Sequence, residues 1–242
     1  MRKMICKNYD ELSRVAANIV ARQIWNNPDT VLGLATGSTP VGMYKNLAGM
    51  YAAGDLDFSR VASFNLDEYY PIAKDNSQSY DFFMWENLFS HINIERARVH
   101  LPDGSAADPA AEGAAYDRMI EDAGGIDLQV LGIGVNGHIG FNEPAAALEL
   151  ATHKTPLTDS TIEANARFFN SADEVPRHAL TMGLGTIFNA KTILMLISGA
   201  NKAAVVQKMF SGFLSPEIPA SLLALHPNTL VLLDEDAAGL LP

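Results

Sequence analysis

Five short apolar runs constrain the fold of this 242-residue chain more than any other feature of its sequence. They lie at residues 31–35, 61–66, 127–133, 191–198 and 229–233. Continuous apolar runs of this length are typical of strands that are covered on both faces. Segments with helical spacing lie at residues 9–26, 40–53, 77–90, 108–123 and 199–211. This alternation predicts a Rossmann-like α/β fold, in which right-handed crossovers build a mostly parallel sheet with helices on both faces.

Capping residues support two of the predicted helix starts. Asp108 before Pro109 is typical of an N-cap followed by the first helical residue. The same helix is predicted to end at the glycine pair 124–125. Thr39 before Pro40 predicts a second start of the same kind.

The stretch from about residue 145 to 180 has mixed polarity and weak periodicity. It is too long for a simple connection inside a compact domain. Two interpretations stay open: a lid over a site, at roughly residues 150–178, or an irregular surface excursion. Because the sequence shows no internal repeat or linker, residues 1–242 are predicted to form one domain.

Composition excludes several classes of protein. A net charge of −11 and a pI near 4.9 oppose the basic surface that nucleic-acid binding requires. Cys6 is the single cysteine, which excludes a disulfide within the chain and a thiolate metal cage and is typical of a reducing compartment. The first residues turn polar too early for a signal peptide, and no apolar run approaches the ~20 residues that cross a bilayer. We therefore expect a cytoplasmic protein that has neither a nucleic-acid nor a membrane partner.

The segment GLATGSTP, at residues 33–40, places a turn of small residues between a buried strand and a helix. Backbone N–H groups at such a helix start, with the hydroxyls of Thr36, Ser38 and Thr39, favour a phosphate site. The segment lacks the lysine of a nucleotide-binding P-loop, so a sugar phosphate suits it better than a nucleoside triphosphate. A plain turn with a threonine cap is the alternative.

The segment VASFNLDEYY, at residues 61–70, runs from a strand pattern into Asp67 and Glu68. Ligands of open α/β sheets bind beyond the carboxyl ends of the strands, so Asp67 would face a substrate. Apolar neighbours would raise the pKa of Asp67 and suit it to abstract a proton. An acidic turn in solvent is the alternative, and it is the commoner meaning of an isolated Asp-Glu pair.

The segment LGIGVNGHIGFNEP, at residues 131–144, follows a predicted strand and contains a GxGxxG spacing. We reject a dinucleotide site, because Pro144 limits the helix that such a site needs. The dense glycines indicate that backbone approaches a ligand closely or takes unusual angles. His138 and Glu143 would then form a proton-transfer pair, whereas a hydrogen-bonded structural imidazole is the alternative for His138.

No metal site is predicted. The remaining histidines show neither an i, i+4 pair nor an HxxE spacing; they are His91, His100, His153, His178 and His226.

With these segments in view, nearly the whole chain resembles the glucosamine-6-phosphate deaminase family. The motifs that carry the resemblance are LATGSTP, FNLDEYY and GHIGFNEP, with SYDFFMWENLF at 79–89, ANARFFN at 164–170 and SGANKAAVV at 198–206. The resemblance implies conversion of glucosamine 6-phosphate and water to fructose 6-phosphate and ammonia, without a cofactor.

The same resemblance implies a role for each matching residue. His138 would open the pyranose ring, and Glu143 and Asn136 would orient and polarise it. Asp67 would move a proton from C2 to C1 through an enolamine, and the resulting C2 imine would be hydrolysed. The phosphate would bind the turn, with cationic partners in the other motifs; the residues are Thr36, Gly37, Ser38, Thr39, Arg167 and Lys202. Arg167 lies in the stretch that forms the family's lid, so phosphate binding and closure would be linked.

Two departures from the family pattern bear on these expectations. Some longer members have Asp where this chain has Asn136, and because an amide cannot stabilise an imidazolium by charge, Glu143 would carry more of that role. Ala146, His153 and Thr155 lie near positions where allosteric members place a serine and basic residues, and the sequence given stops at Pro242 without the C-terminal extension of longer forms. The resemblance therefore implies a short, non-allosteric form that is a monomer or a weak homo-oligomer.

Three alternatives compete with this hypothesis. A 6-phosphogluconolactonase shares the fold, but lactone hydrolysis needs no carboxylate to abstract a C2 proton. A deaminase for another amino-sugar 6-phosphate, such as the galactosamine epimer, stays open because one inverted hydroxyl leaves no trace in the sequence. A non-enzymatic sugar-phosphate sensor of a transcription regulator is disfavoured by the acidic charge and by the short segment before the first predicted strand.

Overall fold

The computed structural model describes residues 1–166, 169, 171 and 174–242. The strands of its main sheet are β1 (Arg2–Cys6), β2 (Val31–Leu34), β3 (Ala62–Asn65), β5 (Val99–His100), β6 (Leu128–Leu131), β9 (Thr192–Ile197) and β10 (Thr229–Asp234). Their order is β1-β10-β9-β6-β2-β3-β5, and each neighbouring pair is parallel. All five predicted strands are present, at the centre of this sheet.

Helices cover both faces of the sheet, as predicted. They are α1 (Tyr9–Asn26), α2 (Val41–Ala52), α3 (Tyr80–Asn87), α4 (Pro109–Asp122), α5 (Asp159–Asn165), α6 (Leu184–Phe188), α7 (Ala203–Met209) and α8 (Glu235–Ala238). Short 3₁₀ helices add η1 (Phe89–His91), η2 (Arg96–Arg98), η5 (Ala200–Lys202) and η6 (Pro219–Leu225). Among the described residues, no helix is both long enough and apolar enough to cross a membrane.

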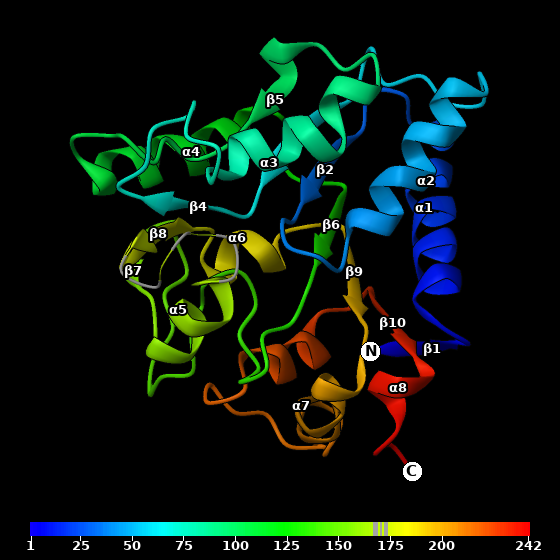
Figure 1. Ribbon diagram of the computed structural model, residues 1–242, viewed down its shortest axis with the longest axis vertical. Helices are drawn as coiled ribbons and strands as arrows, with labels where there is room; N and C mark the ends of the chain where they lie inside the picture. Colours follow the sequence, from blue (N-terminus) through cyan, green and yellow to red (C-terminus); the bar gives the residue numbers. More distant parts are fainter. Residues whose placement is uncertain (167–168, 170, 172–173) are drawn as a thin grey trace.

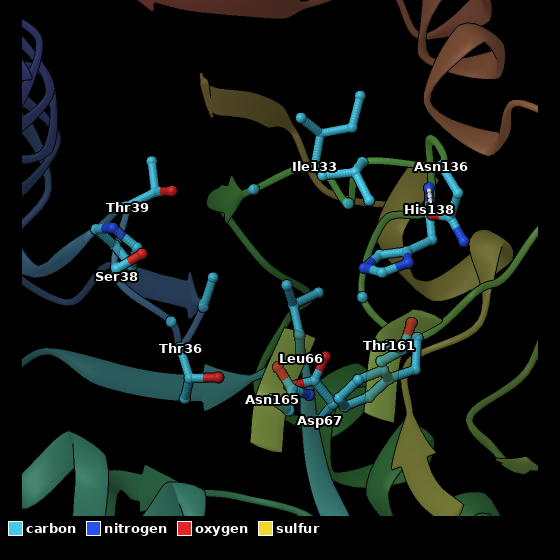
Figure 2. Close-up of a pocket in the computed structure, with 18 of the residues that line it drawn as sticks. Thr36, Ser38, Thr39, Leu66, Asp67, Ile133, Asn136, His138, Thr161 and Asn165 are labelled. Atoms are coloured by element: carbon cyan, nitrogen blue, oxygen red, sulfur yellow. Dashed lines mark hydrogen bonds between the residues drawn. The ribbon is translucent and has the colours of Figure 1, made fainter. Parts of the chain in front are cut away.

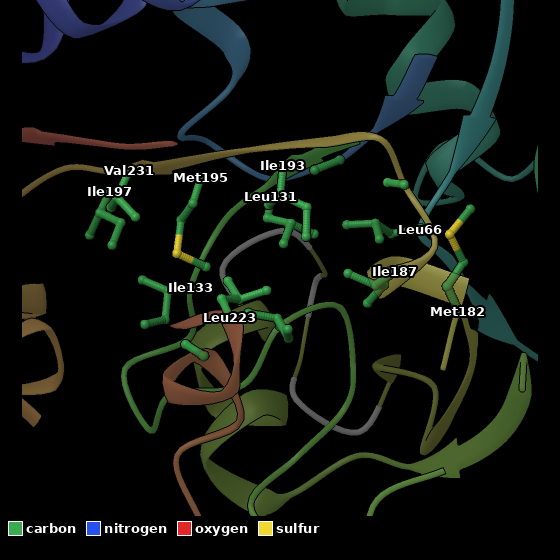
Figure 3. Close-up of a cluster of buried hydrophobic side chains, with 14 of the residues drawn as sticks. Leu66, Leu131, Ile133, Met182, Ile187, Ile193, Met195, Ile197, Leu223 and Val231 are labelled. Carbon is green, nitrogen blue, oxygen red and sulfur yellow. The ribbon is translucent and has the colours of Figure 1, made fainter. Parts of the chain in front are cut away.

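The core lies in two layers because side chains alternate along each strand. In β9, Ile193 and Met195 face a cluster formed with α4, α6, α7, η6 and α8. Leu194, between them, faces the opposite cluster, which α1, α2 and α3 cover. Figure 3 shows the first cluster, in which Ile187 and Leu223 lie opposite the β9 side chains.

One predicted helix start is confirmed and the other is wrong. Asp108 is the N-cap of α4, and its side chain accepts hydrogen bonds from two backbone N–H groups of the first turn. The α2 helix, in contrast, begins at Val41, and Pro40 before it has helical backbone angles and makes no side-chain cap. Thr39 is therefore not the N-cap of α2, and its hydroxyl makes no capping hydrogen bond to that helix.

A second, antiparallel sheet was not predicted. It consists of β4 (Asp67–Tyr70), β8 (His178–Thr181) and β7 (His153–Pro156), in the order β4-β8-β7. Together with α5 it lies at one side of the molecule (Figure 1). Because β7 and α5 both fall within residues 145–180, the interpretation of that stretch as an irregular excursion is wrong.

Candidate active site

The three motifs surround one cavity of about 220 Å³ at the carboxyl edge of the main sheet. Strands β6, β2 and β3 are neighbours there, so the turns that follow them meet. The predicted residues that line the cavity are Thr36, Gly37, Ser38, Thr39, Asp67, Asn136, His138 and Lys202. In Figure 2 the turn with Thr36 and Ser38 faces His138 across the cavity, and Asp67 lies between them along one wall.

Glu143 does not line the cavity but lies behind His138. Its Oε2 is 3.2 Å from Nδ1 of His138 and accepts a hydrogen bond of 2.6 Å from Nδ2 of Asn136. The other end of the amide holds the histidine too, because the backbone N–H of His138 donates to Oδ1 of Asn136 at 3.2 Å. The Nε2 side of the ring is left to face the cavity, as a proton-transfer group requires.

The surroundings of Glu143 keep its carboxyl group ionised. Burial alone would raise its pKa, but hydrogen bonds from His138, Thr161 and Asn136 and the nearby His138 charge lower that pKa to about 2. The side chain of Glu143 is only 9% exposed, so water does little to screen these contacts. Glu143 thus sets a carboxylate beside the ring of His138, an arrangement that stabilises an imidazolium.

Gly134 makes room for the histidine. A Cβ atom at this position would overlap three atoms of the His138 ring. The backbone of Gly134 therefore approaches a side chain of the same turn, whereas the predicted approach to a ligand stays a prediction. The unusual backbone angles that were the other prediction are present at Gly137 and Gly140, whose φ angles are 97° and 58°.

Asp67 is the first residue of β4 and is 7% exposed. Burial, and then the charge of neighbouring Glu68, raise the pKa of Asp67 to about 8. Strand β8 ties this carboxyl group to the histidine turn, because Thr181 pairs with Asp67 and its hydroxyl accepts from the N–H of Phe141 at 3.0 Å. A buried carboxylate with such a pKa is a stronger base than one in water.

The turn after β2 has the features of an anion site. Gly37 has a φ of 91°, a left-handed conformation that favours glycine. Among the hydrogen bonds between described residues, none is donated by the backbone N–H groups of Gly37, Ser38 or Thr39. The hydroxyl of Tyr9 fixes the turn, since it donates to the Ser38 carbonyl at 3.0 Å and accepts from the Gly42 N–H at 2.8 Å. Because residues 37–39 also line the cavity, their N–H groups are available to an anion there.

Of the two predicted cationic partners of the phosphate, Lys202 and Arg167, the structure describes only Lys202. Lys202, at the end of η5, lines the cavity, and its Nζ donates to the Ile133 carbonyl at 2.7 Å. Arg167 lies outside the described residues. Groups of three or more potential metal ligands are absent from the part of the chain that the structure describes.

Sequence reasoning missed the residues that other elements bring to the cavity. Helix α5 contributes Ser160, Thr161 and Asn165, and the aromatic rings of Tyr80 and Phe141 stack at a centroid distance of 6.3 Å on another wall. Thr158 before Asp159 was the available sign of the α5 start, because its side chain caps that helix. The weak periodicity of this stretch hid the signal.

The sequence model of a family described as glucosamine-6-phosphate isomerases and 6-phosphogluconolactonases matches residues 7–232. A glucosamine-6-phosphate deaminase of Clostridium perfringens is 56% identical over the whole of both chains. One from Thermoanaerobacter pseudethanolicus is 54% identical, over 100% of this chain and 96% of its own length.

Solved structures agree with these sequence matches. The structure of a monomeric glucosamine-6-phosphate deaminase has a TM-score of 0.97 and 46% identity, and the match covers 99% of this chain and 100% of that one. A 6-phosphogluconolactonase from Leishmania guyanensis has a TM-score of 0.78 with 20% identity over 100% of this chain and 98% of its own. At that identity the likeness shows the fold alone.

Proposed function

Since the chain belongs to the family of glucosamine-6-phosphate isomerases and 6-phosphogluconolactonases, we propose that it converts glucosamine 6-phosphate and water to fructose 6-phosphate and ammonia. The observation that carries the proposal is the pair formed by Asp67 and His138, two proton-transfer groups on one cavity. Lactone hydrolysis breaks no C–H bond, so it needs no carboxylate to abstract a proton from C2.

Ring opening is the first step. His138, held at Nδ1 by Glu143, takes the proton of the anomeric hydroxyl and delivers it to the ring oxygen. The transient imidazolium is stabilised by the Glu143 carboxylate, which the low pKa keeps charged. Asn136 adds hydrogen bonds rather than charge, so Glu143 is the anionic partner of His138 in this mechanism.

Isomerisation follows in the open chain. Asp67 removes the proton from C2 while the carbonyl oxygen at C1 gains one, which gives an enolamine. Asp67 then returns its proton to C1 as the amino group gives up one, which leaves an imine at C2 and a hydroxyl at C1. Water then adds to the imine carbon and ammonia leaves, so atoms and charge balance without an oxidant or reductant. The raised pKa of Asp67, about 8, supports this role because it makes the carboxylate a stronger base toward the C2 proton than an ordinary carboxylate.

Substrate binding uses the other side of the cavity. The N–H groups and hydroxyls of residues 36–39 hold the phosphate, with Lys202 and Arg167 as cationic partners. Residues 150–178, including α5, form a lid over the sugar. The protein acts as a monomer, as the solved relative of 46% identity does; sedimentation of a dimer at assay concentrations would contradict this.

One assay tests the activity. Purified protein is incubated separately with glucosamine 6-phosphate, galactosamine 6-phosphate and 6-phosphogluconolactone, and ammonia, fructose 6-phosphate and lactone are measured. We expect ammonia and fructose 6-phosphate from the glucosamine substrate. Absence of ammonia with both amino sugars would refute the proposal, and release from the galactosamine substrate alone would move it to the epimer.

Asp67→Asn tests the base. The amide keeps the size of the side chain but cannot accept a proton, so exchange of the C2 hydrogen with deuterated water should be lost. Substrate binding, measured by calorimetry, should stay within about three-fold, since less than 1 kcal/mol of contact energy is altered. Exchange at the wild-type rate would remove Asp67 from the mechanism.

A further inference from the structure

The two carboxylate oxygens of Glu143 face different parts of the fold. Oε2 contacts His138 and Asn136, as described above. Oε1 accepts a hydrogen bond from the hydroxyl of Thr161 and lies 3.3 Å from the hydroxyl oxygen of Thr158. One carboxylate therefore joins the histidine turn to α5.

We propose that Thr161 is a positioning residue for ring opening, which holds Glu143 so that its other oxygen stays against Nδ1 of His138. The inference rests on the proposed function, because it assigns Thr161 to a step of that reaction. Thr161 acts through Glu143 and needs no contact of its own with the reacting atoms.

The local geometry favours donation of the Thr161 hydroxyl hydrogen to Glu143. A threonine hydroxyl has one hydrogen to donate, and that of Thr158 can go to the Thr161 oxygen, 3.0 Å away. The hydrogen of Thr161 then goes to Glu143, which gives a chain from Thr158 through Thr161 to the carboxylate. Thr161 is 5% exposed, so water does not replace a lost donor readily.

The same contact links sugar binding to the histidine. Helix α5 also presents Ser160 and Asn165 to the cavity, so a sugar that contacts them fixes the helix that carries Thr161. In Figure 2, Thr161 lies beside His138 on the wall that Asp67 shares. The hydrogen bond from Thr161 also contributes to the low pKa of Glu143, which agrees with a donor to the ionised carboxylate.

Thr161→Val tests the inference, because it removes the hydroxyl and keeps the shape. Thr161→Ser keeps the hydroxyl and should retain most of the activity. Thr186→Val is the matched control, since the Thr186 hydroxyl on α6 also donates to a carboxylate, Oδ1 of Asp117 at 2.9 Å, but does not line the cavity. Melting by circular dichroism checks each fold, and Thr161→Ala replaces the valine variant if the latter does not fold.

The kinetic readouts separate ring opening from the later steps. In Thr161→Val, kcat for glucosamine 6-phosphate should fall about 10- to 100-fold, the usual effect of losing a hydrogen bond to a charged group. Affinity for the open-chain amino-alditol 6-phosphate should change less than about three-fold, because that ligand needs no ring opening. With substrate deuterated at C2, the isotope effect on kcat should be no larger than in the wild type, since ring opening limits the variant.

Three outcomes would overturn the inference. They are a kcat in Thr161→Val equal to that of Thr186→Val, an increased isotope effect, and a loss in Thr161→Ser as large as in Thr161→Val. A wild-type protein that releases no ammonia would instead refute the proposed function itself, so the two failures are distinguishable.

Discussion

Asp67 and Glu68 are adjacent carboxyl groups in β4, yet their surroundings give them different tasks. Asp67 lines the cavity, whereas Glu68 accepts three backbone N–H groups, from Tyr69, Tyr80 and Asp81. Burial raises the pKa of Glu68 to about 7 in spite of these hydrogen bonds. Glu68 therefore fastens the start of α3, which carries Tyr80 to the cavity, and its charge helps to raise the pKa of Asp67.

The raised pKa of Asp67 predicts a cost in stability at high pH. The ordinary pKa of 3.8 is raised to about 8 on folding, so the folded state holds a proton that the unfolded state releases. Stability from this group is complete below pH 3.8 and is lost as the pH rises through 8, by at most about 6 kcal/mol. Between pH 5 and pH 8.5, the free energy of unfolding in urea should fall more for the wild type than for Asp67→Asn. Equal falls in the two proteins would contradict the raised pKa of Asp67.

Gly134→Ala is expected to damage catalysis through His138. Since a Cβ would overlap the imidazole, the ring must leave its contact with Glu143, and kcat should fall at least about ten-fold, which corresponds to about 1.4 kcal/mol. Gly49→Ala is the matched control, because a Cβ there meets no atom within 4 Å and Gly49 lies on α2, outside the cavity lining. If the two variants have the same kcat, the histidine is not confined in the way described.

At the scale of elements, α4 offers the cleanest test of a predicted cap. Asp108 accepts hydrogen bonds of 3.0 Å from the N–H groups of Ala110 and Ala111, so Asp108→Ala should cost about 1 kcal/mol of unfolding free energy. Asp122→Ala, at the other end of the helix, should cost nothing, because a negative charge there opposes the helix dipole. The kcat of both variants should match the wild type, since α4 does not line the cavity.

Which elements could be predicted depended on what surrounds them. The central strands, such as β6 and β10, are covered on both faces and therefore have continuous apolar sequences. Edge strand β1 is mostly exposed, and β7 alternates between intermediate and exposed residues, so neither has an apolar run. Their pairing is decided by partners that lie far away in the sequence.

The candidate site divides in the same way. Asp67, His138 and the 36–39 turn each follow a strand, so sequence order alone placed them at one edge of the sheet. Thr161 and Tyr80 come from helices that the antiparallel sheet and Glu68 bring to the cavity. Local sequence patterns cannot predict such contacts, because the residues that make them lie far apart in the chain.

At the scale of the whole molecule, the site depends on one sheet with two apolar faces. The cavity lies where β6, β2 and β3 end, and both clusters of buried side chains hold these strands. If residues 1–242 are one domain, as proposed, loss of one face should unfold the other and the site with it.

Leu194→Ala tests this dependence. Leu194 is fully buried in the cluster under α1 and α2, on the face opposite Met195, and does not line the cavity. Its truncation should cost about 2–5 kcal/mol by leaving a cavity, while the folded fraction keeps its kcat. The matched control is Leu225→Ala, because Leu225 is 65% exposed.

Urea transitions of Leu194→Ala, followed by fluorescence and by circular dichroism, should coincide and keep the wild-type slope, because a single domain unfolds in one step. Two separated transitions would show that the two faces fold independently and would refute the single-domain proposal.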